Sequence, residues 1–165
     1  MGPLPPLSIL SHSPEETQRL GEMLGRLAQP GDVLLLCGDL GSGKTCLTQG
    51  IARGLGVQDS VRSPTFVLAT EHAGRVPLYH IDLYRIEDPR EVEGLGLDDY
   101  IEDDGVCVVE WADKAISYFP KEHLLIELEP AGEHQRRIRR VARGPRYAAL
   151  LEKLRPHVQK LRRSS

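Results

Sequence analysis

The sequence predicts an α/β fold in a single domain, with a central parallel sheet, antiparallel edge strands and helices on both faces of the sheet. Short continuous apolar runs, typical of strands buried on both faces, alternate with segments whose apolar residues recur at helical spacing. Two later apolar runs carry interspersed charges, which predicts strands with one solvent-exposed face. The length of 165 residues fits one domain with a substantial core.

The first helix is expected to begin at residues 13–16, where a Ser cap precedes Pro in the first turn and Glu follows three residues after the Ser. Pro30-Gly31 ends its pattern of apolar residues at helical spacing, which are Leu20, Met23, Leu24 and Leu27. The apolar run 33–37 then predicts a buried strand. A glycine-rich turn follows, and after it a helix that Gly56 closes, with Leu47, Ile51 and Leu55 on its inner face.

The rest of the chain contains further strands and two more helices. Strands are expected at 66–69, 76–81, 106–109, 124–128 and 137–141. Pro77 indicates either an edge strand or the beginning of a strand. A short helix is expected to open at Asp88-Pro89-Arg90-Glu91, and a last one at about Tyr147. The late strands are expected to be antiparallel additions at one edge of the sheet.

Composition excludes several classes of protein. No run of about 18 apolar residues occurs, which excludes a membrane span, and N-terminal prolines stand where a secretory signal needs basic and apolar residues. Cys37, Cys46 and Cys107 are odd in number and lack C-x-x-C spacing. They therefore argue against disulfides or a zinc site and are interpreted as small reduced core residues. A soluble, cytoplasmic protein without membrane contact is expected.

Charge is distributed unevenly along the chain. Residues 1–132 carry a net charge of −12 and residues 133–165 carry +9, within a total of −3. We expect residues 1–145 to form the domain, and residues 146–165 to form a basic helix or tail that packs on it or extends from it. This basic segment either contacts RNA or an acidic partner, or presents solvated basic faces while docked on the acidic body.

One motif carries specific chemistry. Residues 38–45 fit G-x-x-x-x-G-K-[ST], the P-loop or Walker A motif, between a buried strand and an amphipathic helix as the motif requires. Glycines let the backbone approach phosphate oxygens, and the helix start adds N–H groups. Lys44 supplies a charge for the β- and γ-phosphates, and the Thr45 hydroxyl is a ligand for Mg²⁺. Nucleotide is therefore expected on Gly38, Asp39, Leu40, Gly41, Ser42, Gly43, Lys44, Thr45 and Cys46.

Hydrolysis also needs a carboxylate near the metal and a group that orients water. Asp82 and Glu110 each directly follow an apolar strand, and Thr65 follows the rigid Ser63-Pro64. The simpler interpretations are a turn cap for Asp82, a surface carboxylate for Glu110 and an ordinary loop residue for Thr65.

Two further side chains near these carboxylates are ambiguous. Trp111 is either a core residue or a lid over the site. His80 is interpreted as a packed histidine with satisfied hydrogen bonds in preference to a base.

The combination of residues 38–45, Ser63-Pro64-Thr65-Phe66, residues 80–85 and Glu110-Trp111 resembles the TsaE family, also called YjeE. Its members are the bacterial ATPases of tRNA threonylcarbamoyladenosine biosynthesis. The order and spacing agree across roughly residues 8–145, and residues 94–99 are also similar. The resemblance implies one P-loop NTPase domain that binds ATP or ADP with Mg²⁺ and hydrolyses ATP weakly when alone.

The resemblance also implies partners. These are TsaB and TsaD homologues, which transfer a threonylcarbamoyl group to the adenosine beside the anticodon, while the ATPase supports repeated cycles. Contact with tRNA is then either indirect or made through the basic tail.

Site roles also follow from the resemblance. The catalytic residues it implies are Lys44, Thr65, Asp82 and Glu110, with Thr45, Asp82 and Glu110 around the metal. In this scheme Asp82 is the Walker-B-like acid and Glu110 the second metal-side carboxylate. Trp111 is the aromatic beside the site, Ser13 lies near the nucleotide base, and Arg136 reaches the nucleotide.

Other functions compete with this interpretation. A small-molecule kinase shares the P-loop, but the segment between Asp82 and Glu110 holds only Arg85 and Arg90 for an arginine-rich lid. A switch GTPase would carry an Asn-Lys-x-Asp segment, which the sequence lacks. A nucleotide-gated binding module, in which ATP orders Thr65 and the acidic stretch 86–104 for a partner without required hydrolysis, stays open.

Overall fold

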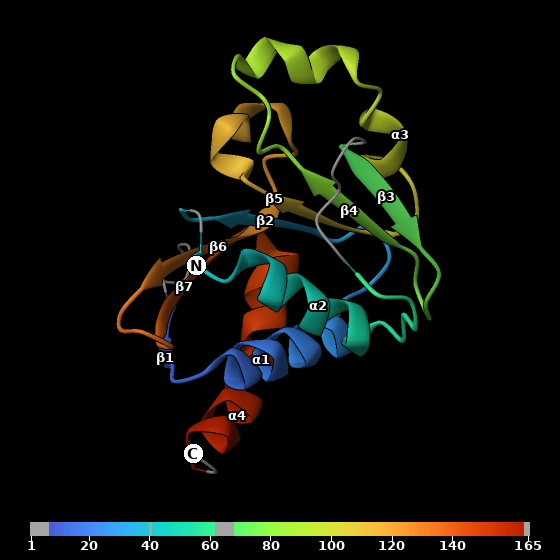
Figure 1. Cartoon of the computed structure of the whole chain (residues 1–165). Coiled ribbons are helices and arrows are strands. Elements are labelled where there is room, and N and C mark those ends of the chain that lie inside the picture. Colours follow the sequence, from blue (N-terminus) through green and yellow to red (C-terminus); the bar gives the residue numbers. More distant parts are fainter. Residues whose placement is uncertain (1–6, 40, 62–67, 164–165) are drawn as a thin grey trace.

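The computed structural model describes residues 7–39, 41–61 and 68–163. Its sheet has the strand order β1-β7-β6-β2-β5-β4-β3 (Figure 1). The strands are β1 (Leu7–Ser11), β2 (Val33–Cys37), β3 (Ala69–His72), β4 (Leu78–Asp82), β5 (Val106–Glu110), β6 (His123–Pro130) and β7 (Arg136–Arg143). The helices are α1 (Pro14–Leu27), α2 (Lys44–Gly54), α3 (Asp98–Ile101), α4 (Pro145–Arg163) and the 3₁₀ turns η1 (Pro89–Gly94), η2 (Ala112–Lys114) and η3 (Ile116–Tyr118).

The centre of the sheet is parallel, as predicted. β2 pairs in parallel with both β5 and β6, and β4 pairs in parallel with β5. Antiparallel strands stand at both edges. The late strand β7 is such an addition, as expected, whereas β6 is parallel to β2 and was wrongly expected to be antiparallel. The antiparallel β3 at the other edge was not predicted. β7 and β1 extend one edge, whereas β3 pairs antiparallel with β4 at the other. Only residues 73–77 separate β3 from β4, which is too short for the crossover that parallel pairing needs.

Two strands differ from their predicted positions. The strand expected at 66–69 is described only from Ala69, because residues 66 and 67 lie outside the described ranges, and β3 continues to His72. Pro77 directly precedes β4, which lies between β3 and β5, so it marks a strand beginning and not an edge. The prediction had no strand at β1, although Ile9 and Ser11 alternate there as buried residues with more exposed neighbours.

The sheet separates two layers of helices (Figure 1). α1, α2 and α4 cover one face, where their apolar residues share a core with Leu34 and Leu36 of β2 and Val108 of β5. The short helices cover the other face, with Val92 of η1 and Ala112 of η2 in a second core. Helices on both faces were predicted, and the second layer consists of short helices of three to six residues.

α1 begins as its capping sequence predicts. The Ser13 hydroxyl accepts a hydrogen bond from the Glu16 N–H at 3.1 Å, and Glu16 Oε2 accepts one from the His12 N–H at 2.7 Å. Burial raises the pKa of Glu16, but hydrogen bonds from His12 outweigh burial and leave it below its usual value.

α1 and α2 pack backbone to backbone through glycines. A Cβ on Gly50 would lie 2.1 Å from the Gln18 carbonyl, and one on Gly54 would lie 2.2 Å from that of Glu22. Gly21 and Gly25 of α1 approach α2 equally closely. Since contacts advance along both helices in the same direction, the pair is parallel and both N-termini lie at the same end.

α4 belongs to the same core as the rest of the chain. Its buried residues include Leu150, Leu151 and Leu154, each at most 1% exposed. The Tyr147 hydroxyl accepts a hydrogen bond from the Val33 N–H at 2.9 Å. Arg146 binds the buried Asp32 through two hydrogen bonds, of 2.7 and 3.0 Å. The described part of the basic C-terminal segment therefore packs on the domain. The proposed domain boundary at residue 145 stays a prediction.

Several basic residues of the C-terminal segment pair with acids of the same chain. Arg137 lies 3.3 Å from Glu129, and Arg139 lies 2.9 Å from Glu127, both between β7 and β6. Together with the Arg146–Asp32 pair, these contacts favour the interpretation of basic faces docked on an acidic body.

The cysteines are free, but only Cys107 is buried. The expectation of three core cysteines was therefore wrong for Cys37 and Cys46, which are partly exposed beside the glycine-rich loop. Among the described helices, none has the length and apolar character needed to cross a membrane.

Candidate nucleotide-binding site

The glycine-rich loop joins the end of β2 to the start of α2. Gly38 approaches its neighbours so closely that a Cβ would lie 2.4 Å from the Leu128 carbonyl and 2.6 Å from Ser42 Oγ. Gly43 has a φ of 102° and precedes α2 without a side-chain cap. The first turn of α2 is therefore not covered by a capping side chain, an arrangement that lets an anion approach the N–H end of the helix. Leu40 lies outside the described residues.

Lys44, the first residue of α2, is buried, and its ammonium lies among polar atoms of this loop. Its Nζ donates to the Gly38 carbonyl and, at 2.9 Å, to the Asp39 carbonyl, and it lies 3.2 Å from Ser42 Oγ. Burial lowers the pKa of Lys44, although the surrounding carboxylates, with Glu110 first, oppose this effect. The ammonium is thus desolvated and held among polar atoms of the loop.

Asp82 and Glu110 lie side by side at the carboxyl ends of β4 and β5. They are register partners, and they are 7% and 1% exposed. The interpretation of Glu110 as a surface carboxylate was therefore wrong. Asp82 also caps its own turn, because its Oδ1 accepts a hydrogen bond from the Tyr84 N–H at 2.9 Å.

The Glu110 carboxylate is contacted by three side chains. Thr45 Oγ1 donates to Oε1 at 2.9 Å, and His80 Nε2 binds Oε2. The Thr48 hydroxyl donates at 2.9 Å to the Lys44 carbonyl and also lies 3.3 Å from Oε2. The loop hydroxyl and the strand-end carboxylate are thereby joined directly. Thr48 was missed in the sequence, although its place three residues after Thr45 on the same helix face was the available signal.

His80 agrees only in part with its interpretation as a satisfied core histidine. Its side chain is fully buried. Among the described residues, however, its Nδ1 has no hydrogen-bond partner.

Asp82 differs from Glu110 in its surroundings. Burial raises the pKa of Asp82 above its usual value, and the neighbouring Glu110 adds to the rise, while the Tyr84 N–H opposes it. A carboxylate of this kind accepts a proton more readily than a solvated one.

Trp111 forms one wall of the site beside Lys44. Its ring centroid lies 3.8 Å from Lys44 Nζ and 5.2 Å from that of the exposed Tyr84. Its φ of 58° is the left-handed conformation, which is uncommon for a large residue. Lys114 Nζ, which donates to the Ile86 carbonyl at 3.1 Å, lies 5.5 Å from the Trp111 centroid. The half-buried ring packs against the second core and also lies beside Lys44, so the choice between core residue and lid stays open, and the sequence had not indicated Tyr84 or Lys114.

Two more predicted residues lie near the loop. Ser13 caps α1, and the carbonyl of the next residue, Pro14, accepts a hydrogen bond from Cys46 Sγ at 3.2 Å at the start of α2. The Arg136 side chain passes 3.7 Å from where a Cβ on Gly43 would lie, while its Nη1 donates to the Gln135 carbonyl at 2.8 Å. Thr65, together with the segment 63–66, lies outside the described residues, so its role stays a prediction.

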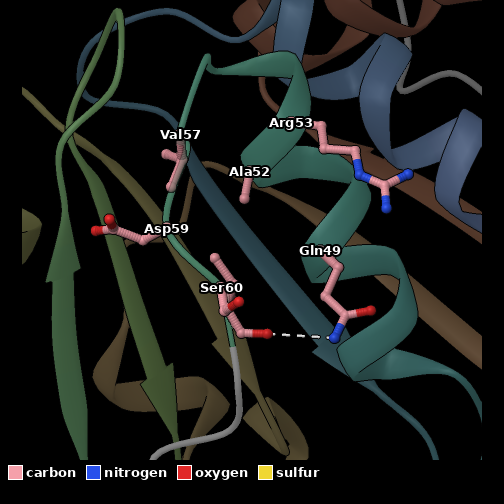
Figure 2. A pocket seen from close by; sticks show the side chains of 7 residues that line it. Gln49, Ala52, Arg53, Val57, Asp59 and Ser60 are labelled. Atoms are coloured by element: carbon pink, nitrogen blue, oxygen red, sulfur yellow. Dashed lines mark hydrogen bonds between the residues drawn. The ribbon is translucent and has the colours of Figure 1, made fainter.

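A separate hollow of about 320 Å³ lies farther along α2, between that helix and residues 57–61 (Figure 2). Gln49, Arg53, Asp59 and Ser60 contribute to its lining, and Gln49 Nε2 donates to the Val61 carbonyl at 3.2 Å across one side. Of the predicted site residues that the structure describes, none lines it.

The oxygen atoms around the loop are suitable ligands for a hard cation bound together with a phosphate. The Thr45 hydroxyl and the two carboxylates offer oxygen ligands, which Mg²⁺ prefers, and Mg²⁺ usually completes its shell with water and phosphate oxygens. Within the described part of the chain, no group of three or more His, Cys, Asp or Glu side chains forms a metal site by itself.

Comparison with known proteins identifies the family. A family model described as "Threonylcarbamoyl adenosine biosynthesis protein TsaE" matches residues 11–138. The chain belongs to the TsaE family. The matched residues contain the P-loop, both carboxylates, Trp111 and Arg136.

Individual TsaE proteins are similar over most of their length. The "tRNA threonylcarbamoyladenosine biosynthesis protein TsaE" of Bacillus subtilis is 48% identical over 146 residues, which cover 88% of this chain and 91% of that protein. TsaE of Treponema pallidum is 38% identical over 78% of this chain and 96% of its own. The crystal structure of YdiB from Bacillus subtilis superposes with a TM-score of 0.82 at 40% identity, covering 95% of this chain and 99% of that one. The predicted α/β fold of P-loop type is confirmed.

Proposed function

We propose that this TsaE-family chain is a Mg²⁺-dependent ATPase that supports tRNA threonylcarbamoyladenosine modification. The observation that carries the proposal is the 2.9 Å hydrogen bond from Thr45 Oγ1 to Glu110 Oε1. It joins the hydroxyl of the P-loop to a buried carboxylate on the neighbouring strand, which is the pairing that a magnesium–triphosphate site requires. Membership of the TsaE family supports the assignment to tRNA threonylcarbamoyladenosine biosynthesis.

The P-loop residues have distinct tasks in this proposal. Lys44 and the N–H groups at the start of α2 hold the β- and γ-phosphates and stabilise negative charge on them. The Thr45 hydroxyl and Glu110 are the protein ligands for Mg²⁺, directly or through water. When bound, Mg²⁺ neutralises charge on the phosphates and aligns them for in-line attack. Arg136, which passes beside Gly43, is well situated to reach the nucleotide.

Asp82 is the better candidate for orienting the attacking water. It lies one strand farther from the P-loop than Glu110 and is its register partner. Its pKa is raised by burial, so it is suited to accepting a hydrogen bond or a proton from water. From the residues alone either carboxylate can hold the metal, and the family resemblance implies that both lie around it, with Asp82 as the Walker-B-like acid; this proposal gives the metal to Glu110 instead. The contact of Glu110 with Thr45 supports this division of roles.

Hydrolysis by the isolated chain is expected to be slow. Arg85 is the candidate arginine finger within the chain, and its side chain is exposed. A finger can contribute roughly 10³–10⁵ in rate, so an incomplete site turns over slowly until a partner supplies or orders one. The partners in this proposal are TsaB and TsaD homologues. Steady-state hydrolysis should rise when both are added, and fast turnover by the chain alone would contradict the incomplete site.

Calorimetric titration with ADP, with and without Mg²⁺, tests the carrying observation. Thr45→Ala should abolish the gain in affinity that Mg²⁺ provides, and Thr45→Ser, which keeps a hydroxyl, should retain it. An unaltered Mg²⁺ dependence in Thr45→Ala would refute the metal role. Product analysis separates this proposal from the two alternative functions. A phosphorylated small-molecule acceptor would indicate a kinase. An undiminished yield of modified tRNA over many cycles with a non-hydrolysable ATP analogue would indicate a nucleotide-gated binding module.

Contact with tRNA is proposed to be indirect. The internal ion pairs of Arg137, Arg139 and Arg146 reduce the positive charge available to phosphates. Arg143 and Lys153 are exposed and can be reversed without touching the core. If Arg143→Glu with Lys153→Glu leaves tRNA affinity in the assembled complex unchanged, the contact is indirect; a large, salt-dependent loss would indicate direct binding.

A further inference from the structure

His80 is a fully buried imidazole in the middle of β4. Along β4, Leu78, His80 and Asp82 alternate onto the face that α2 covers, and Glu110 of β5 shares that face. Its Nε2 binds Glu110 Oε2, and its Nδ1 has no partner among the described residues. Buried polar atoms without partners cost free energy and call for an explanation.

The Glu110 carboxylate needs support from more than one side. Thr45 and Thr48 both belong to α2, whereas His80 belongs to the sheet. Without His80, the hydrogen bonds described for this carboxylate would come from a single helix. A carboxylate that accepts from the Thr45 hydroxyl offers only lone pairs to its other partners, so the imidazole donates from Nε2. Nδ1 is then an acceptor, and the polar atom without a partner is a lone pair and not an N–H.

We propose that His80 is the positioning residue for Glu110 in the nucleotide site, an inference that rests on the proposed ATPase function. Its Nε2–H holds Oε2, so that Oε1 stays directed at the Thr45 hydroxyl. His80 is fully buried on β4 and binds Oε2, whereas Thr45 on α2 binds Oε1. It therefore acts through Glu110 and touches neither nucleotide nor metal. Hydrogen bonds behind a metal ligand commonly orient that ligand in this manner.

The hydrogen bond itself can be tested without nucleotide. In protein labelled with ¹⁵N-histidine, long-range ¹H–¹⁵N spectra should assign one histidine as the Nε2–H tautomer with a slowly exchanging N–H. Glu110→Ala should make that N–H exchange rapidly or shift strongly, in protein that remains folded by circular dichroism. An Nδ1–H tautomer, or an N–H signal indifferent to Glu110→Ala, would overturn the proposal.

Kinetics test the consequence. His80→Leu fills the space without a donor and should lower kcat for Mg²⁺-ATP by about 10–100-fold, with KM near that of the wild type. His80→Gln can present an amide N–H near the Nε2 position and should recover most of the rate. His80→Asn carries its amide near the Nδ1 position and should not. If His80→Leu fails to fold, the contrast between Gln and Asn keeps the test decisive, and equal rates for Gln and Asn would reject the proposal.

A matched control separates positioning from general burial of a histidine. His123 is also buried, but it stands at the beginning of β6, at the end of the parallel sheet away from the P-loop. His123→Gln should leave kcat and KM unchanged. If the wild type shows no ATP hydrolysis with its partners, the proposed function fails, while the tautomer experiment still decides whether His80 holds Glu110.

Discussion

Asp82 and Glu110 are register partners on neighbouring parallel strands, and both carboxylates are buried beside the P-loop. Two acidic side chains this close are costly in a folded protein, because burial and mutual repulsion disfavour their charged forms. Glu110 is compensated by hydrogen bonds with Thr45 and His80, and the Thr48 hydroxyl lies 3.3 Å from it. Asp82 has one described bond from its own turn and a raised pKa. The stability of the protein should therefore be sensitive to charge at Asp82.

Asp82→Asn should stabilise the protein at pH 7 and slow hydrolysis. Asn keeps an oxygen for the Tyr84 N–H and removes the buried charge, and gains of about 0.5–2 kcal/mol in the free energy of unfolding are typical of such relieved sites. Because the folded-state pKa is raised, the wild type loses stability as pH rises through it. The difference between the two proteins should be largest at neutral pH and vanish below about pH 4. Urea unfolding over pH measures it.

The control for this prediction is Asp113→Asn, since Asp113 is exposed near the same site. That change should stay within about 0.5 kcal/mol of the wild type. A stability loss in Asp82→Asn at pH 7 would mean that the Asp82 carboxylate is favourably bound in the fold.

Trp111, the single tryptophan, should report nucleotide binding. Lys44 Nζ lies 3.8 Å from its ring centroid, and a phosphate that attracts the ammonium should draw it away. Titration with Mg²⁺-ATP should therefore change Trp fluorescence saturably. Lys44→Met should alter the spectrum of the free protein and abolish the response. Lys114→Met, which removes the ammonium 5.5 Å from the ring, should retain it. Unchanged fluorescence at calorimetric saturation would contradict this coupling.

Gly54→Ala should destabilise the fold. Its Cβ would lie 2.2 Å from the Glu22 carbonyl and force α1 away from α2, and overpacking of this kind typically costs about 1–3 kcal/mol. Gly94→Ala is the matched control, because a Cβ there meets nothing within 4 Å. Thermal unfolding of both variants should separate them. Equal melting temperatures would mean that the helix pair yields without cost.

Arg146→Met should destabilise the protein far more than Arg155→Met. The Arg146→Met substitution removes both hydrogen bonds from the guanidinium to the buried Asp32. Removing one partner of a buried ion pair costs about 3–5 kcal/mol in the free energy of unfolding. Arg155 makes an exposed pair with Glu152 at 3.5 Å, and such pairs contribute about 0–1 kcal/mol. Denaturant unfolding measures both. A small effect at Arg146 would indicate that α4 does not depend on this contact.

Elements whose signals are local could be predicted from the sequence. The apolar run of β2, the cap of α1 and the glycine pattern of the P-loop each depend on neighbouring residues, so α1, β2 and the start of α2 were predicted at their observed positions. Asp82 and Glu110 were also predicted as site residues, because each directly follows an apolar run typical of a buried strand.

How these parts meet depends on contacts between distant segments of the chain. Thr45 and Glu110 are 65 positions apart, and His80 and Glu110 are 30 apart, so no local pattern encodes their hydrogen bonds. The glycine contacts of α1 with α2 and the pairing of β1 with β7 likewise depend on distant segments. Such contacts form because strand register and helix packing bring side chains of one face together, and those depend on the whole folded core.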